Sequence, residues 1–258
     1  MKIIAVANQK GGVGKTTTAV NLSACLAEKK QRVLVVDSDP QGNTTSGLGI
    51  ERRPGGASVY DVLVNAVPMD SVVTATKWAN LSICPSSIHL AGAEIELANL
   101  DNREFRLKSE LSAVADKYDF VIIDCPPSLG FITVNALAAA NTVLIPIQCE
   151  YYALEGLSQL TATIKSVRRE INPSLDIEGA LLTMFDSRTN LSIEVAEEVK
   201  RALPRKVCST VIPRNVRLSE APSFGEPIIN YDTNSRGAEC YRALADEIIQ
   251  KNRGTSNG

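Results

Sequence analysis

The segment from Asn8 to Leu22, NQKGGVGKTTTAVNL, combines residue types that bind phosphate. It directly follows a short apolar run and leads into a stretch with the apolar spacing of a helix. A glycine-rich turn that leads into a helix directs several backbone N–H groups and the positive end of the helix dipole at one point. The residues predicted to surround a polyphosphate are Lys10, Gly11, Gly12, Val13, Gly14, Lys15, Thr16 and Thr17.

Lys15 and Thr16 supply the charge and the hydroxyl that such a site needs. Lys15 would place its ammonium on the β- and γ-phosphates, and Thr16 would offer its hydroxyl to Mg²⁺. These roles predict ATP and Mg²⁺ as the ligands. The alternative is a glycine-rich turn that ends in GKT by chance, but the strand predicted before it and the helix predicted after it argue against that reading.

The loop departs from the ordinary Walker A pattern, G-x-x-x-x-G-K-[ST], at its first glycine. That pattern needs glycine at position 9, where this chain has Gln9. The segment instead matches K-G-G-x-G-K-[ST], the deviant Walker A loop, in which a second lysine, here Lys10, is the distinguishing residue. We therefore predict that Lys10 acts in catalysis together with Lys15.

Three aspartates follow apolar runs that are predicted to be strands. VVDSDPQGN contains Asp37 and Asp39, and IIDCPPSLG contains Asp124. Asp124 has the Walker B position and is expected to hold Mg²⁺ through water, while Asp39 is expected to orient or activate the attacking water as a third catalytic residue. Asp37 would contribute to the metal site indirectly or merely support its neighbours. The alternative for Asp39 and Asp124 is capping of the turn that follows.

Apolar β-branched runs alternate with amphipathic stretches along the chain, which predicts an α/β fold with a mostly parallel twisted sheet and helices on both faces. The predicted strands are Lys2–Val6, Arg32–Val36, Leu81–Cys84, Phe120–Ile123, Val143–Ile147, Ile177–Thr183 and Val207–Ile212. The predicted helices are Thr17–Glu28, Phe131–Ala140, Leu154–Arg169, Ser192–Ala202 and Ala238–Gln250. No linker divides the chain, so we expect one ATPase domain over residues 1–252 and a disordered tail over 253–258.

Length, composition and charge exclude several classes of protein. A chain of 258 residues with 44% hydrophobic residues can bury a core without disulfides, and its six cysteines and one histidine lack the spacing of a disulfide framework or a zinc site. The apolar run at the N-terminus is too short for a signal-peptide core or a membrane span, so we expect a cytoplasmic protein. A net charge of −2 means that any contact with DNA must come from a local patch.

Together with these motifs, several longer segments closely resemble the ParA/Soj chromosome-partitioning ATPases, members of the MinD/ParA group of P-loop proteins. The resemblance runs nearly end to end and includes QKGGVGKTTTAVNL, VVDSDPQGNTTSGLGI, HLAGAEIEL, FVIIDCPPSLG, IPIQCEYYALEGLSQL, LLTMFDSRTNL and TVIPRNVRLSEAPSFGEPI. The last of these segments go well beyond a generic phosphate-binding loop.

The resemblance implies a homodimer that forms around ATP. Lys10 of one subunit would reach the phosphates bound in the other, and Gly11 would lie where the two subunits approach too closely for a side chain. Pro213 and Asn215 match the family positions that hold the adenine; from the sequence alone, this Pro-Arg-Asn turn reads only as a loop. A lysine that acts across the interface would make ATP itself stabilise the dimer.

The resemblance also implies binding to double-stranded DNA without sequence preference, and thus association with the nucleoid. Arg188 falls on the family's DNA-contacting arginine, and Arg217 is a second candidate contact. The alternative for each is a solvated surface arginine. A ParB-type centromere-binding protein is the expected partner, and it would stimulate an otherwise slow hydrolysis.

Two relatives with the same loop suggest other functions. A MinD-like membrane-associated ATPase would end in a basic amphipathic helix, whereas the last predicted helix here mixes acidic and basic residues, so we expect no membrane partner. A nitrogenase-type iron protein would need cluster cysteines, and Cys84 and Cys125 have no companion at that spacing. ATPases that position other cargo remain an open alternative. Trp78, His89, Tyr151 and Tyr152 are expected to be packing or capping residues.

Overall fold

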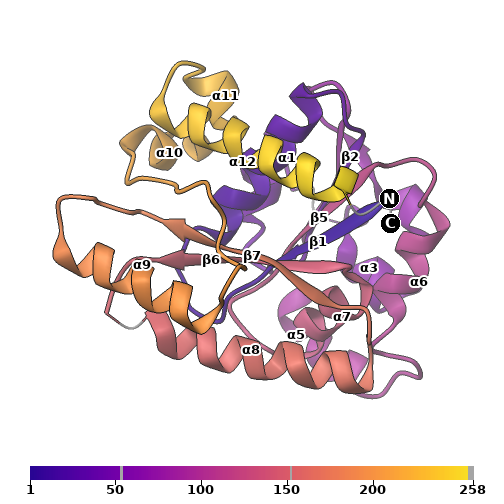
Figure 1. Cartoon of the computed structure of the whole chain (residues 1–258). Coiled ribbons are helices and arrows are strands. Elements are labelled where there is room, and N and C mark those ends of the chain that lie inside the picture. Colours follow the sequence, from indigo (N-terminus) through magenta and orange to yellow (C-terminus); the bar gives the residue numbers. More distant parts are fainter. Residues whose placement is uncertain (53–54, 152, 255–258) are drawn as a thin grey trace.

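Apolar β-branched runs form one sheet that is covered by helices on both faces (Figure 1). The computed structural model describes residues 1–52, 55–151 and 153–254. The strands are β1 (Lys2–Val6), β2 (Val33–Asp37), β3 (Thr74–Ala75), β4 (Leu81–Cys84), β5 (Phe120–Asp124), β6 (Thr142–Gln148) and β7 (Asp176–Thr183). Their order is β3-β4-β2-β5-β1-β6-β7, and every pairing except β3 with β4 is parallel. The predicted mostly parallel sheet is confirmed.

The helices form one layer on each face of the sheet. They are α1 (Lys15–Glu28), α2 (Asn43–Gly47), α3 (Val59–Leu63), α4 (Met69–Val72), α5 (Leu90–Leu97), α6 (Arg106–Ala113), α7 (Phe131–Ala139), α8 (Ala153–Glu170), α9 (Asn190–Ala202), α10 (Val216–Glu220), the 3₁₀ helix η1 (Ala221–Phe224), α11 (Ile228–Tyr231) and α12 (Arg236–Gly254). Helices α1, α11 and α12 cover one face, and α3 and α5 to α9 cover the other (Figure 1).

Strand β5 shows why the apolar runs are continuous rather than alternating. Phe120 and Ile122 pack with α1 and α12, whereas Val121 and Ile123 pack with α7 and its neighbours, and all four side chains are buried. A parallel strand with helices on both sides must be apolar at every position, since each face loses its water.

The parallel register brings the chemistry-bearing loops to one edge of the sheet. The last residue of β1, Val6, pairs with Asp124 at the end of β5, and Asp37 at the end of β2 pairs with Asp124 from the other side. The loop that starts at Ala7 therefore emerges beside both aspartates. Parallel strands end at the same edge, so this arrangement follows from the strand order alone.

The predicted strand Val207–Ile212 was wrong. Among the described residues the segment makes isolated bridges rather than a ladder, with Val207 beside Ala180 and, just past the end of the segment, Pro213 beside Phe185. Its central backbone N–H groups, those of Ser209 and Thr210, donate to the carboxylate of Glu247 on α12, each at 3.0 Å. A further strand of the sheet would use these backbone N–H groups to bond its neighbours. Because the Glu247 side chain accepts them instead, the segment makes no continuous ladder.

The C-terminal helix extends beyond the predicted domain boundary. Helix α12 continues to Gly254, so residues 253 and 254 of the predicted tail are helical, and glycine is a common residue at a helix end. Residues 255–258 lie outside the described part of the chain. Among the residues that the structure describes, no helix combines the length and the apolarity needed to cross a membrane.

The aromatic residues expected to pack behave differently from one another. Trp78 packs against the cluster around α1, and the His89 ring lies 5.6 Å from that of Tyr60. Tyr151, by contrast, is 79% exposed because it follows the end of β6 in a loop at the sheet edge. Tyr152 lies outside the described residues.

Glu247→Ala should destabilise the fold by about 1–3 kcal/mol, because it leaves the two N–H groups of the 207–212 segment without their acceptor. Urea denaturation at pH 7 measures this change in the free energy of unfolding.

Although burial opposes ionisation, the Lys251 ammonium and these N–H groups lower the pKa of Glu247. Its contribution is therefore present above the carboxyl's unfolded pKa, and the difference between wild type and variant should shrink below about pH 4.

Glu239→Ala on the same helix is the matched control. Glu239 pairs with exposed Arg236, at 3.1 Å. Removal of an exposed ion pair should change the free energy of unfolding by less than about 0.5 kcal/mol. Equal effects of the two substitutions would contradict the role given to Glu247.

Candidate active site

The glycine-rich loop links β1 to α1 and needs glycine at two positions. Gly12 and Gly14 have φ values of 74° and 90°, in the left-handed region where a side chain is strained. Gly14 is the N-cap of α1, and no side chain among the described residues caps this helix. The first N–H groups of α1 therefore face the loop, and the predicted binding of phosphate there stays a prediction.

The two lysines of the loop point to different places. The buried Lys15 ammonium donates to the backbone oxygen of Lys10 at 3.0 Å. Burial lowers the pKa of Lys15, and the nearby carboxylates of Asp124 and Asp39 oppose that shift. The half-buried Lys10 ammonium instead lies 3.4 Å from Glu150, just past the end of β6, and Gln148 donates to the other oxygen of that carboxylate.

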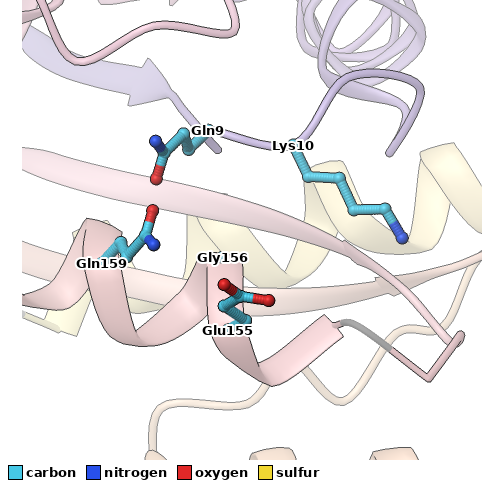
Figure 2. Close-up of a pocket in the computed structure, with 5 residues that line it drawn as sticks. All are labelled: Gln9, Lys10, Glu155, Gly156 and Gln159. Carbon is cyan, nitrogen blue, oxygen red and sulfur yellow. The ribbon is translucent and has the colours of Figure 1, made fainter.

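A cavity of about 220 Å³ lies between the loop and the start of α8 (Figure 2). Its lining comprises Gln9, Lys10, Glu155, Gly156 and Gln159. Figure 2 shows Lys10 extended away from Gln9, and the two glutamines facing each other across the cavity. The Lys10 side of the loop thus borders open space rather than packed core.

Asp124 lies at the centre of the buried polar groups. One of its oxygens accepts hydrogen bonds from the hydroxyls of Thr16, at 2.8 Å, and Thr44, at 2.7 Å. Its other oxygen is buried and has no hydrogen-bond partner among the described residues. Burial raises the pKa of Asp124, and the Asp39 carboxylate adds to this shift. A cation close by would offset both effects.

Asp37 and Asp39 are held by their own loop. One oxygen of Asp37 accepts from the backbone N–H of Asp39 at 3.3 Å, and the other accepts from the N–H and the hydroxyl of Thr45, at 2.7 and 2.6 Å. This is the geometry of a supporting residue. Asp39 accepts from the N–H of Gln41 at 2.9 Å, which is the turn capping weighed above, but this bond occupies only one of its two oxygens.

Several residues of the site were missed by the sequence analysis. Thr44 and Thr45 support the aspartates, Thr183 donates to the backbone oxygen of Val13 at 2.9 Å, and Asn8 bonds the backbone of Lys10 at 3.1 Å. The polar run QGNTTSG after Asp39 was the available signal for the threonines. Asn8 follows the end of β1, and Thr183 is the last residue of β7. This position at the end of a strand is the only feature of the sequence that could have marked them as site residues.

The turn with Pro213 and Asn215 lies beside the loop. The N–H of Ile212 donates to Leu182 at 2.9 Å, and the N–H of Phe185 donates to Ile212 at 3.1 Å, so the end of β7 anchors this turn. Residue 183 of the same strand contacts the loop. Asn215 caps α10 by accepting from the N–H of Arg217 at 2.8 Å. The predicted adenine contact of Pro213 and Asn215 stays a prediction.

The two candidate DNA contacts have different surroundings. Arg188 is 87% exposed and makes a bidentate pair with Asp186, at 2.9 and 2.7 Å, which lowers the pKa of Asp186 to about 2. Arg217 lies between two carboxylates, 2.9 Å from Glu220 and 3.4 Å from Asp232. Neither arginine is part of the buried polar cluster.

The residues present fit a nucleotide with Mg²⁺. The unpartnered oxygen of Asp124 and the hydroxyl of Thr16 are hard oxygen donors, which Mg²⁺ prefers. Within the described residues no group of three or more His, Cys, Asp or Glu side chains could hold a metal alone. Mg²⁺ commonly binds through one or two protein oxygens together with water and phosphate oxygens, so no such group is needed.

The fold and this loop define a P-loop ATPase of the deviant Walker A type. The AAA domain family model matches residues 1–177. The chain is 61% identical to the sporulation initiation inhibitor protein Soj of Bacillus subtilis, over 96% of this chain and 98% of that protein. It is 55% identical to the chromosome partitioning protein ParA of Myxococcus xanthus, over 97% and 88%. The chain belongs to the Soj/ParA family of chromosome-partitioning ATPases.

Solved structures agree with this assignment. Cobyrinic acid a,c-diamide synthase from Mycobacterium smegmatis, with bound ADP and magnesium, is 39% identical with a TM-score of 0.86, over 98% of this chain and 96% of that chain. MinD from Pyrococcus horikoshii, complexed with Mg-ADP, is 26% identical with a TM-score of 0.80, over 96% and 95%. Both are consistent with ATP and Mg²⁺ as the ligands expected here.

The cysteines considered for an iron–sulfur cluster are packing residues. Cys84 and Cys125 are buried, and burial raises the pKa of both thiols.

Gly12→Ala should weaken nucleotide binding about tenfold, because a side chain in the left-handed region costs roughly 1–2 kcal/mol. An alanine Cβ at position 12 would meet no atom within 4 Å, so the effect isolates backbone strain. Titration of a fluorescent ATP analogue at low protein concentration measures it.

Gly11→Ala is the matched control. Position 11 also has no atom within 4 Å of an added Cβ, and its φ is not in the left-handed region. Nucleotide affinity should stay within about twofold of wild type, below the tenfold that corresponds to 1.4 kcal/mol. Normal binding by the Gly12 variant would show that the loop does not need this conformation.

Proposed function

We propose that this chain is an ATP-driven switch for DNA partitioning. ATP joins two copies face to face, the pair binds duplex DNA without sequence preference, and partner-stimulated hydrolysis separates the copies. The observation that carries this proposal is the divergence of the two loop lysines. Lys15 lies within the cradle, whereas the Lys10 ammonium lies on the β6 and α8 side, against Glu150.

The direction of Lys10 supports a role in the neighbouring copy. Its backbone oxygen already accepts from Lys15, and its side chain extends away from Gln9 (Figure 2) with the ammonium 3.4 Å from Glu150. A lysine that neutralises phosphates bound in a second copy makes the nucleotide part of the interface. The free energy of ATP binding then favours the pair over the separate copies.

Gly11 supports the same arrangement. Neither local space nor backbone conformation requires glycine at this position in one copy. We attribute the glycine to a second copy that approaches the loop closely, as the resemblance to the ParA/Soj ATPases implies.

The chain's own residues account for hydrolysis as follows. Lys15 and the N–H groups at the start of α1 would bind the phosphates, and Thr16 would hold Mg²⁺ directly while Asp124 would hold it through water. When bound, Mg²⁺ would neutralise charge on the β- and γ-phosphate oxygens. Asp39, with one oxygen turned to Gln41, uses the other to orient the attacking water, and Lys10 of the second copy stabilises the transferring phosphoryl group.

Arg188 is the residue on which the DNA part of the proposal rests. Its exposed pair with Asp186 contributes little to stability, so a phosphate can replace that carboxylate. Two copies would present two such arginines, which lets an acidic monomer bind DNA as a dimer. Arg217 remains a second candidate, but Glu220 and Asp232 oppose the approach of a phosphate.

The last helix favours DNA over a membrane as the surface that the protein binds. Helix α12 buries Tyr241, Leu244 and Ile248 against α1. An interfacial helix must instead keep its apolar face free for lipid. Sedimentation with liposomes in the presence of ATP distinguishes the two surfaces, and lipid binding by wild type would favour the MinD-like alternative.

Asp39→Ala should trap an ATP-bound, DNA-bound dimer, because it removes the group that orients water but leaves the cradle intact. Hydrolysis should fall at least about 100-fold, the usual contribution of a positioned carboxylate. Phosphate release and sedimentation in ATP measure the two effects.

Lys15→Ala is the contrasting variant, since it should lose ATP binding and therefore dimer formation as well. Normal turnover by the Asp39 variant would rule out the role assigned to Asp39. A wild-type protein that stays monomeric in ATP and Mg²⁺, with hydrolysis blocked, would rule out the switch itself.

Arg188→Ala should reduce the salt dependence of DNA binding. Each phosphate contact contributes about 0.9 to the slope of log K against log salt, so loss of one arginine per copy should lower a dimer's slope by roughly 2. Binding of random duplex DNA is measured with ATP and with ADP, and only the ATP form should bind.

Arg236→Ala is the matched control. Arg236 is also an exposed arginine paired with one carboxylate, with a side chain that is 72% exposed, but it lies on α12. Its loss should leave the slope unchanged. Binding that is independent of ATP, or a slope that Arg188→Ala does not change, would remove DNA from the proposed function.

A further inference from the structure

The side chain of Asn8 joins the glycine-rich loop to strand β6. It is 4% exposed, its amide nitrogen donates to the backbone oxygen of Pro146 at 2.8 Å, and its oxygen accepts from the backbone N–H of Lys10 at 3.1 Å. Pro146 lies inside β6, which pairs with both β1 and β7. Asn8 therefore fixes the backbone of Lys10 against an internal strand of the sheet.

We propose that Asn8 is a positioning residue that directs Lys10 toward the second copy. The inference rests on the proposed function, because it assumes that Lys10 acts across the interface. Asn8 itself would touch neither nucleotide nor water. It acts by holding the backbone of Lys10 so that the side chain leaves the loop on the α8 side, where Glu150 and Gln148 lie.

Helix α8 supports this position from outside the loop. An added Cβ on Gly156 would lie 3.3 Å from the oxygen of Asn8 and 3.8 Å from the Cβ of Lys10. The first distance is tighter than an ordinary van der Waals contact. Glycine at position 156 thus leaves the space that the Asn8–Lys10 hydrogen bond occupies, in the wall of the cavity in Figure 2.

The cradle for phosphate has supports of its own. Thr183 holds the backbone oxygen of Val13 at 2.9 Å, and the N–H of Thr18 donates to Gly14 at 2.9 Å. Neither contact involves Asn8. Loss of the Asn8 amide should therefore release Lys10 while the part of the loop that contains Gly12 and Gly14 keeps its shape.

Loss of the Asn8 side chain should weaken the pairing of two copies without weakening nucleotide binding. Without Asn8 the Lys10 backbone loses its acceptor, and the lysine can turn to phosphates in its own copy. Nucleotide affinity of a separate copy would then not fall, since Lys15 and the N–H groups at the start of α1 still bind the phosphates. Pairing would weaken, because the charge no longer crosses the interface.

The test is Asn8→Ala combined with Asp39→Ala, which blocks hydrolysis. A fluorescent ATP analogue measures nucleotide affinity at low protein concentration, and sedimentation in ATP and Mg²⁺ measures the dimer dissociation constant. Relative to Asp39→Ala alone, affinity for the analogue should change by less than about threefold and the dimer should weaken by at least about tenfold. Gly156→Ala, whose added Cβ on α8 would lie close to the Asn8 oxygen, should likewise weaken the dimer and leave affinity for the analogue nearly unchanged.

Asn172→Ala in the same background is the matched control. Asn172 is also 4% exposed and donates to the backbone oxygens of Leu137 and Ala140, at 3.0 and 2.8 Å, away from the loop. It should lose comparable stability without weakening the dimer. Addition of Asn8→Ala to Lys10→Ala should weaken the dimer no further than Lys10→Ala alone, because Asn8 acts through Lys10.

Unchanged pairing in the Asn8 variant, equal losses of nucleotide affinity and pairing, or additive effects with Lys10→Ala would each overturn this inference and leave the proposed function in place. If the Asp39→Ala protein already fails to pair in ATP, or pairs equally well without Lys10, the role of Lys10 across the interface is overturned, and the role of Asn8 falls with it.

Discussion

Burial of negative charge at one edge of the sheet is the constraint on which the site depends. Asp37, Asp39 and Asp124 are all buried there, and burial raises the pKa of Asp37 and Asp124. Hydroxyls of Thr16, Thr44 and Thr45 stabilise these carboxylates, and Lys15 is the nearby cation. One oxygen of Asp124 has no hydrogen-bond partner among the described residues, so these residues do not complete this balance. A divalent cation with a polyphosphate would complete it.

The parts of the molecule that could be predicted are those set by local pattern. The strand runs, the helix that starts at Lys15 and the meeting of Asp37 with Asp124 follow from apolar spacing and parallel order. The strand at 207–212 was wrong because Glu247, on a helix far along the chain, takes its backbone donors. Asn8 was missed because its partner, Pro146, is 138 residues away. The apolar pattern of the sequence thus predicts helices and strands. Contacts between segments far apart in the chain decide which strands pair at the edge of the sheet and which polar groups support the site.

Helix α12 holds the helix that follows the phosphate cradle. Tyr241 and Thr18 share a buried hydrogen bond of 3.2 Å, and half-buried Arg242 donates to both oxygens of Glu28 at 2.8 Å at the far end of α1. Helix α1 is thus fastened to the sheet on one side and to α12 on the other. Because α1 is held on both sides, the phosphate cradle at its N-terminus has a fixed position relative to the sheet and to α12.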